Sequence, residues 1–233
     1  MSINTNLIAC SGVKGSGKDV AASMFQYCLS VPKIFRQYWL YKTIGKIVPK
    51  KWKILAFADP LKRMLAVLLN VPVEKFNDRT FKEEYCIDLN TLDYGLVSLQ
   101  KDKKALSDSK FTKMAKELDK DILNYKLTIR QLLQYYGTNI MHSYFTKNVW
   151  INSTLRNAED NTIIADCRFI AEAEAIKRNQ GIIFYIDRPG IGFGQHQSEK
   201  EMQKMLQEGT YYNYIINNNG SIEDLFNQIR KFI

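Results

Sequence analysis

Histidine is almost absent from this 233-residue chain, which contains only His142 and His196. Two histidines leave almost no raw material for a zinc cluster or for a cysteine–histidine nucleophile system. The four cysteines, at positions 10, 28, 86 and 167, form no C-x-x-C pair, so we expect reduced, mostly buried thiols. Magnesium held by carboxylates is the one metal that this composition leaves worth proposing.

Long apolar runs are lacking as well. No stretch approaches the ~18 apolar residues that a membrane-spanning helix needs, and the start, Met1-Ser2-Ile3-Asn4, lacks the basic and apolar regions of a signal peptide. We therefore expect a cytoplasmic protein without membrane contact. With 45% apolar and 24% charged residues, the chain is ordinary globular material, and we expect one domain over residues 1–233.

Acidic residues are scarce in one region. Between Val31 and Arg63 there are nine Lys or Arg residues and one acid, Asp59, so nearly all of the net charge of +9 is concentrated there. Interleaved aromatic residues make the segment similar to a single-stranded nucleic-acid site. Two plainer interpretations stay open: a helix from Ile34 to Ile47 with a solvated basic face and packed aromatics, or a charge that attracts anionic nucleotides.

Short apolar runs separated by helical patterns predict the strands of the fold. Strands that are apolar throughout are buried on both faces, as in a parallel sheet flanked by helices. The sequence therefore predicts an α/β fold with three layers and a mostly parallel central sheet of about five strands. The predicted strands are Leu7–Ser11, Ile54–Ala58, Thr162–Ala165 and Gly181–Ile186, with a fifth candidate at Tyr212–Ile216.

A glycine-rich loop follows the first predicted strand and runs into a helix-like segment. A phosphate cradle needs backbone N–H groups turned toward the anion, which places glycine where a side chain would collide. Gly12, Gly15 and Gly17 supply that loop, and Lys18 stands where the G-x-x-x-x-G-K pattern requires a cation for the β- and γ-phosphates. The pattern predicts a nucleoside triphosphate site. Its residues are Gly12, Val13, Lys14, Gly15, Ser16, Gly17, Lys18 and Asp19.

Two carboxylates are candidate ligands for magnesium. Asp19 occupies the position after the lysine, where the pattern normally has a Ser or Thr hydroxyl. Asp166 follows an apolar strand, an arrangement that resembles a Walker B strand. Each also has a plain structural interpretation, since Asp19 complements the dipole of a first helical turn and an aspartate after a strand is commonly a helix cap.

The composition changes between Tyr85 and Leu127, where Asp, Asn, Lys and Ser dominate. Helical periodicity is present in one stretch only, with Phe111, Met114, Leu118 and Ile122 on one face. We interpret 85–127 as a polar insertion within the domain.

With the phosphate loop in place, the whole chain resembles the bacteriophage deoxynucleoside monophosphate kinases, a branch of the P-loop nucleoside monophosphate kinases. The likeness runs nearly end to end, and Asp after the loop lysine is also typical of that family. Segments 31–53 and 85–127 look like additions to the family pattern. The shared motifs are G-V-K-G-S-G-K-D at 12–19, F-A-D-P-L-K at 57–62, F-N-D-R-T-F-K-E-E at 76–84, T-I-R-Q-L-L-Q-Y-Y-G-T at 128–138, W-I-N at 150–152, D-C-R-F-I-A-E at 166–172, I-D-R-P-G at 186–190 and H-Q-S-E at 196–199.

The resemblance implies an ATP- and Mg²⁺-dependent enzyme that transfers the γ-phosphoryl group to a deoxynucleoside 5′-monophosphate and supplies dNTP synthesis. Three arginines would clamp the acceptor phosphate and the transferring group, because a guanidinium matches phosphate oxygens bidentately: Arg130, Arg168 and Arg188. For each, a structural ion pair is the alternative. A phage or viral source, and hence a host-cytoplasm location, would follow from the same resemblance.

Further positions are assigned by their match to the family motifs. Asn218 would border the donor adenine, and the glycine-containing segment 189–210, with His196 to Glu199, would form a lid. Asp59 would bind the acceptor sugar or metal, or else cap a helix beginning at Pro60. Trp150 is a core residue in the plain alternative. The expected acceptor-binding residues are Asp59, Lys62, Arg130, Gln134, Gly137, Trp150 and Arg168.

Two other functions stay open from the sequence alone. Phosphomevalonate kinases carry a similar G-K-D loop and a similar set of arginines, so another small phosphate ester is an alternative acceptor. A protein that binds nucleic acid through residues 31–63, with a regulatory ATP site, is the alternative outside the enzymes. The partners that we expect are small nucleotides, and we expect neither nucleic acid nor a membrane. The resemblance also suggests a homodimer.

Overall fold

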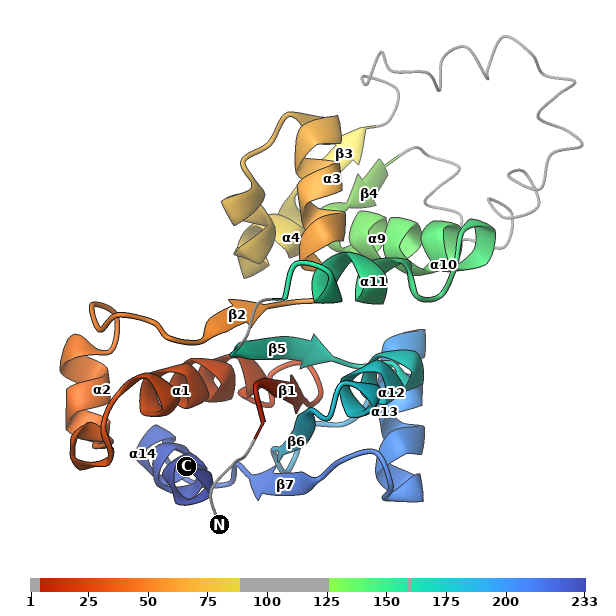
Figure 1. Cartoon of the computed structure of the whole chain (residues 1–233). Coiled ribbons are helices and arrows are strands. Elements are labelled where there is room, and N and C mark those ends of the chain that lie inside the picture. The colour runs from red at the N-terminus through yellow and green to blue at the C-terminus, as the bar shows by residue number, and fades with distance from the viewer. Residues whose placement is uncertain (1–4, 89–125, 159–160) are drawn as a thin grey trace, which may run out of the picture. The chain divides into compact units, whose positions relative to one another are not determined.

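The computed structural model describes residues 5–88, 126–158 and 161–233 (Figure 1). The chain forms two compact units, of which the first comprises Met1–Pro60 with Lys147–Ile233 and the second Leu61–Thr146. The single domain expected over 1–233 stays a prediction.

A five-stranded sheet is the centre of the first unit, in the order β2-β5-β1-β6-β7. Every neighbouring pair in this sheet is parallel, which confirms the predicted α/β fold class. The strands are β1 (Leu7–Ser11), β2 (Lys53–Leu55), β5 (Thr162–Cys167), β6 (Ile182–Asp187) and β7 (Tyr214–Asn217).

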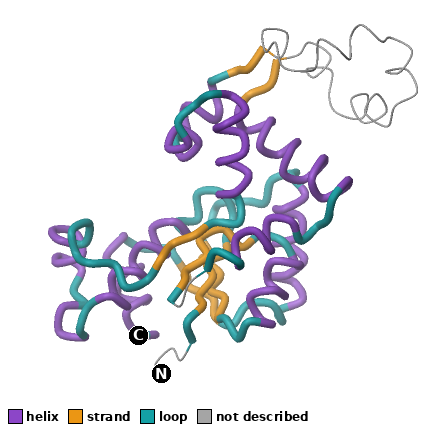
Figure 2. The backbone as a smooth tube through the Cα atoms, turned by 45° about the horizontal axis from the view of Figure 1, so that its top comes forward, coloured by secondary structure: helices purple, strands orange, loops and turns teal. Residues whose placement is uncertain are grey.

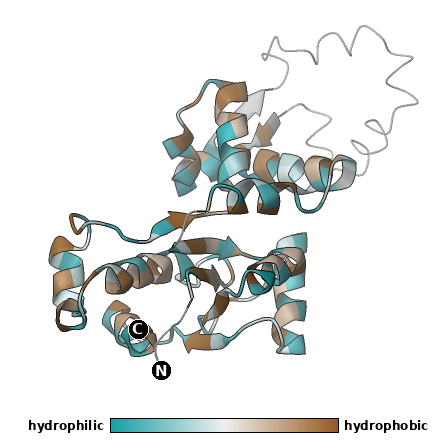
Figure 3. Ribbon diagram, viewed as in Figure 1, coloured by the Kyte–Doolittle hydropathy of each residue, from teal (hydrophilic) through white to brown (hydrophobic). Residues whose placement is uncertain are grey.

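Helices cover both faces of the sheet, which gives three layers (Figures 1 and 2). Alternate residues of β1 point to opposite faces, as the two-residue period of a strand requires. Ile8 and Cys10 pack with α1 (Lys18–Ser30) and α14 (Ile222–Ile229). Leu7 and Ala9 pack with α11 (Val149–Leu155), α12 (Ile170–Arg178) and α13 (Gln197–Glu208). All five residues of β1 are buried, which is why its sequence is apolar almost without alternation (Figure 3).

Some strand bounds differ from those predicted. β2 ends at Leu55, because residues 56–58 leave the sheet and form a turn that is closed by a hydrogen bond from the Asp59 amide to the Ala56 carbonyl. β5 continues to Cys167, so Asp166 lies within the strand and not after it. β6 and β7 begin one and two residues later than predicted and each ends one residue later.

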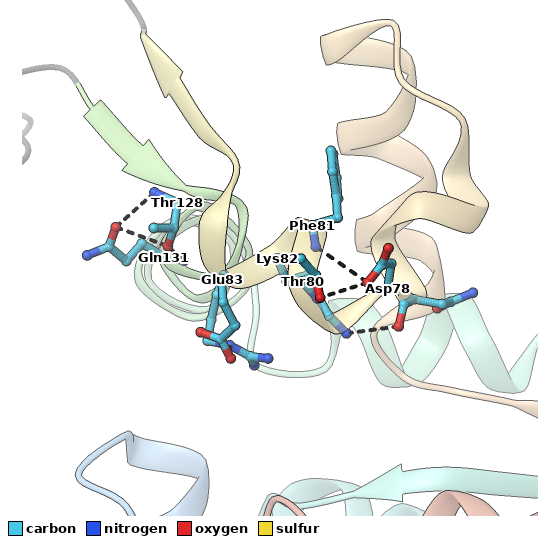
Figure 4. A network of polar contacts seen from close by, with 9 residues as sticks. Asp78, Thr80, Phe81, Lys82, Glu83, Thr128 and Gln131 are labelled. Carbon is cyan, nitrogen blue, oxygen red and sulfur yellow. Dashed lines mark hydrogen bonds and ion pairs between the residues drawn. The ribbon is translucent and has the colours of Figure 1, made fainter.

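The described part of the second unit is mainly helical. Among its described residues, the large side chains of Leu65, Phe76, Ile129 and Leu132 are fully or almost fully buried, and Tyr135 is buried as well. Two helices have side-chain caps, which Figure 4 shows: Asp78 accepts from the amides of Thr80 and Phe81, and Thr128 forms a reciprocal capping box with Gln131. Its described elements are α3 (Asp59–Leu69, starting in the first unit), η2 (Val73–Asn77), α4 (Arg79–Glu84), the antiparallel pair β3 (Cys86–Asp88) and β4 (Lys126–Thr128), α9 (Ile129–Gln134), the π-helical η3 (Tyr135–Ile140) and α10 (Met141–Tyr144).

The basic segment is part of the first unit, and its helices are shorter than the single helix expected over residues 34–47. Residues Lys33–Phe35 form the short helix η1, and α2 runs from Tyr38 to Ile44. Tyr38 and Tyr41 pack on Phe226 of α14, as the packed-aromatic interpretation expects. Trp39, however, is 60% exposed, so the aromatic residues of this segment are only partly packed.

Most of the insertion 85–127 lies outside the described residues, and so does the helix expected around Phe111 to Ile122. Within 189–210, α13 buries Met202 and Met205 completely in the core that α12 shares with the sheet, and a lid function for this region stays a prediction. The chain ends in the short helix η4 (Arg230–Phe232). In the described part of the chain, no helix has the length and apolarity needed to cross a membrane.

Candidate active site

The glycine-rich loop turns between β1 and α1 through backbone conformations that glycine adopts most readily. Gly15 and Gly17 have φ of 89° and 92°, in the left-handed region where a Cβ is unfavourable. The Ser16 amide donates to the Val13 carbonyl at 3.1 Å and closes the turn. The first helical residue is Lys18, so the loop amides and the α1 N-terminus belong to one structure, as a phosphate cradle requires.

Two of the loop glycines are also enclosed by neighbouring atoms. A Cβ on Gly12 would lie 2.7 Å from the Ile186 carbonyl oxygen, and a Cβ on Gly17 would lie 2.6 Å from Nδ2 of Asn218. That Asn218 amide donates to the Ser16 carbonyl at 2.8 Å. The turn after β7 thus packs against the phosphate loop and is hydrogen-bonded to its backbone.

Lys18 is the most enclosed cation of the site, with 4% of the residue exposed. Burial lowers its pKa, and the positive charge of Arg168 lowers it further. The carboxylates of Asp19, Asp166 and Glu199 oppose this effect. The arrangement is therefore two cations and three acids around the beginning of α1, an environment suited to a ligand that itself carries several negative charges.

Asp166 is held by backbone groups from the turn after β2. Its Oδ1 accepts the Phe57 amide at 2.6 Å, and its Oδ2 accepts the Ala58 amide at 3.1 Å. Asp59 closes the same turn, because its Oδ2 accepts the Ala56 amide at 2.8 Å. Both aspartates therefore have structural partners, and α3 begins at Asp59 itself and not at Pro60.

Arg168 is half-buried at the turn from β5 into α12, and the buried carboxylate of Glu172 contacts that turn. Oε2 of Glu172 accepts the Arg168 amide at 2.7 Å and the Phe169 amide at 3.0 Å. Burial raises the pKa of Glu172, the charge of Asp166 adds to this effect, and the two amide hydrogen bonds partly oppose it. Sequence reasoning missed Glu172, although it ends the D-C-R-F-I-A-E motif.

The first turn of α13 brings two more polar groups to this region. Glu199 is buried and accepts the Gly194 amide at 3.2 Å. His196 caps the helix, since its Nδ1 accepts the Ser198 amide at 3.3 Å. Burial lowers the pKa of His196, and so does the Arg168 charge. The expected lid residues thus share an electrostatic environment with Lys18 and Arg168.

In the second unit, Arg130 lies on α9 and forms an ion pair with Glu83, with Nε 2.7 Å from Oε1. Lys62 on α3 donates to Oδ1 of Asn77 at 3.0 Å. Gln134 ends α9, and Gly137 is buried in the π-helical turn that follows, a kind of turn that is frequent at functional sites. The structural ion pair that was the alternative for Arg130 is therefore present, and its role toward a substrate stays a prediction.

The remaining predicted residues lie in the first unit. Trp150 is a buried residue of α11, which fits its plain interpretation as core. Arg188 follows β6 and is exposed. Asn218 contacts the phosphate loop, and its expected place at the adenine stays a prediction. In the described part of the chain, no group of three or more His, Cys, Asp or Glu side chains could hold a metal ion.

Comparisons with known proteins agree with this geometry. The chain is 26% identical over 239 residues to a protein of Acanthamoeba polyphaga mimivirus named "Putative deoxynucleotide monophosphate kinase", with 96% of this chain and 93% of the relative covered. It is 24% identical over 256 residues to the deoxynucleotide monophosphate kinase of Escherichia phage RB69, with 97% and 99% covered. A family model described as deoxynucleotide monophosphate kinase matches residues 6–229. The chain therefore belongs to the deoxynucleotide monophosphate kinase family.

Proposed function

We propose that this protein transfers the γ-phosphoryl group of ATP to a deoxynucleoside 5′-monophosphate and releases ADP and the deoxynucleoside diphosphate. The observation that carries the proposal is the enclosed Lys18 at the end of the glycine-rich loop, with Arg168 close enough to lower its pKa. Membership of the family supplies the class of acceptor.

The cationic residues divide into two groups, according to the phosphate groups that they bind. Lys14, Lys18 and the loop amides bind the donor phosphates, while Arg168, Arg130 and Arg188 bind the acceptor phosphate and the transferring group. An acceptor phosphate oxygen attacks the γ-phosphorus, and the bond to the β-phosphate oxygen breaks. The acceptor is already ionised, so the protein supplies position and charge neutralisation and needs no strong base.

Magnesium fits the chemistry of the residues present. It is commonly held by one or two carboxylates together with substrate phosphates and water, so a cluster of three acids is not needed. Asp19, exposed in the first turn of α1, and Asp166, whose oxygens accept two amides, are the proposed ligands. The bound ion neutralises charge on the phosphate oxygens.

A release assay tests this proposal. ADP formation is followed with Mg-ATP and single deoxynucleoside monophosphates, with ribonucleotides and phosphomevalonate as competing acceptor classes, for the wild-type protein and Lys18→Ala. We expect turnover with at least one deoxynucleotide, reduced in the variant by about two orders of magnitude or more. Turnover with phosphomevalonate alone, or equal turnover by both proteins, contradicts the proposal.

A further inference from the structure

Three consecutive backbone amides open α12 directly after β5, and carboxylates of the chain itself occupy all three. The amides of Arg168 and Phe169 donate to Oε2 of Glu172, at 2.7 Å and 3.0 Å. The Ile170 amide donates to Oε2 of Glu201 at 3.0 Å. A helix N-terminus of this kind attracts anions. Because the two glutamates already accept these three amides, the phosphate contact proposed above for this turn is assigned to the Arg168 guanidinium and not to the backbone.

The two glutamates belong to different helices. Glu172 is a residue of α12, whereas Glu201 is a residue of α13, and its Oε1 also accepts Nε2 of Gln197 at 3.2 Å. Burying a carboxylate such as Glu172 costs free energy even when it accepts hydrogen bonds. Proteins accept such a cost mainly at functional sites, so we expect a buried carboxylate beside a charged site to have a role in the function of that site.

These contacts leave the backbone beside Arg168 little freedom. Two residues before it, Asp166 accepts the amides of Phe57 and Ala58. One and two residues after it, the amides of Phe169 and Ile170 are held by the glutamates. A long arginine side chain reaches a fixed point reproducibly only if its backbone is fixed, and a displacement of about 1 Å in a phosphoryl-transfer site can reduce the rate about 100-fold.

We propose that Glu172 and Glu201 are positioning residues, which hold the turn at residues 168–170 so that the Arg168 guanidinium is presented to the transferring phosphoryl group. The inference rests on the function proposed above and adds two residues that touch neither substrate. It also links α13 to the transfer step, because Glu201 lies on the same helix as Glu199, two residues from it, and five residues after the capping His196.

The test compares Glu201→Ala with Glu201→Gln, which keeps an oxygen acceptor for the Ile170 amide, and with Glu174→Ala, an exposed glutamate of α12. Glu172→Ala removes the acceptor of the Arg168 and Phe169 amides, and Glu172→Gln keeps an oxygen there. We expect Glu201→Ala and Glu172→Ala each to lower kcat/KM for the deoxynucleotide about tenfold with KM for ATP unchanged, and an unchanged kcat/KM in either would overturn the role of that residue. The Gln variants and the control should stay within about threefold of wild type.

A double-mutant cycle separates positioning from general damage. In an Arg168→Ala background, Glu201→Ala should reduce kcat/KM by less than about twofold further, because the residue that it positions is gone. A further tenfold loss would show that Glu201 acts elsewhere and would overturn the inference.

Hydrogen exchange gives a readout that does not need activity. The Ile170 amide should exchange faster in Glu201→Ala than in wild type or in Glu174→Ala, and equal exchange overturns the proposal. If the wild-type protein transfers no phosphoryl group to any acceptor, the proposed function fails, and a positioning role in transfer is overturned with it. If wild type is active and the cycle is additive, only the inference about Glu201 fails.

Discussion

The Asn218 side-chain amide donates to the carbonyl of Ser16 at 2.8 Å, across 202 residues of sequence. This contact ties the turn after β7 to the phosphate loop, so its loss should loosen the loop that binds ATP. We predict that Asn218→Ala raises KM for ATP several-fold and lowers the free energy of unfolding by about 1 kcal/mol. Steady-state kinetics and urea unfolding measure both effects. The exposed neighbour Asn219→Ala is the control, and an unchanged KM for ATP would show that the loop does not depend on the contact.

Lys18 should lower the stability of the ligand-free protein. Its pKa is lowered mainly by burial and next by Arg168, so its surroundings disfavour the charged form despite the nearby carboxylates. Lys18→Met removes the buried charge and keeps an apolar stem. We predict an increase of roughly 1 kcal/mol or more in the free energy of unfolding, together with loss of ATP binding. Chemical unfolding without nucleotide measures the first effect, and a decrease in stability would contradict the electrostatic argument.

His196 should make stability depend on pH. Burial and Arg168 hold its pKa in the folded protein below the ordinary 6.5, and Nδ1 accepts the Ser198 amide, which the protonated ring cannot do. As the pH falls, His196 therefore binds a proton in the unfolded chain before it does so in the folded protein, which favours unfolding. The stabilising contribution is present above about pH 6.5 and is lost as the pH falls through the folded pKa.

The variant His196→Asn isolates this effect, because asparagine is a good helix cap with no titrating group. Between pH 7.5 and 5.5, the wild-type protein should lose more unfolding free energy than the variant does. Parallel losses in the two proteins would remove His196 as the cause.

The ion pair between Arg130 and Glu83 allows two interpretations that charge reversal separates. The pair is partly exposed, with 29% and 36% of the side chains accessible, so its contribution to stability is at most about 1 kcal/mol. If Arg130 binds the acceptor phosphate, Arg130→Glu combined with Glu83→Arg should restore the melting temperature but not kcat/KM for the acceptor. Recovery of both would leave Arg130 with a structural role only.

The sequence was sufficient to predict the phosphate loop and the parallel sheet, because both impose local patterns. Cradling a phosphate fixes glycines at 12, 15 and 17 and a lysine at 18, and burial on both faces makes β1 apolar throughout. The end of β2 was harder to predict. Residues 56–58 are as apolar as a strand, but their amides bond to Asp166 and Asp59, and no pattern within the segment announces those partners.

The contact of Glu201 beside Arg168 could not be predicted from the sequence either, because its hydrogen-bond partners lie far apart in the chain. Arg168 itself follows from its motif, whereas Glu201 meets the Ile170 amide only because α13 packs on α12, 31 residues away in the chain. Charge alone could not indicate this role, since Glu201 and exposed acids such as Glu208 look equivalent in the sequence of α13. The division of the basic segment into packed Tyr38 and exposed Trp39 likewise depends on where α14 lies.

The most direct test of the proposed function is to follow where the γ-phosphoryl group of ATP goes. We would incubate it with ATP labelled at the γ-phosphate, magnesium and each deoxynucleoside monophosphate in turn, and separate the nucleotides. We predict that the label appears in the β-position of a deoxynucleoside diphosphate and that Lys18→Ala abolishes this product. Label found only in inorganic phosphate, or remaining in ATP with every acceptor, would contradict the proposed function.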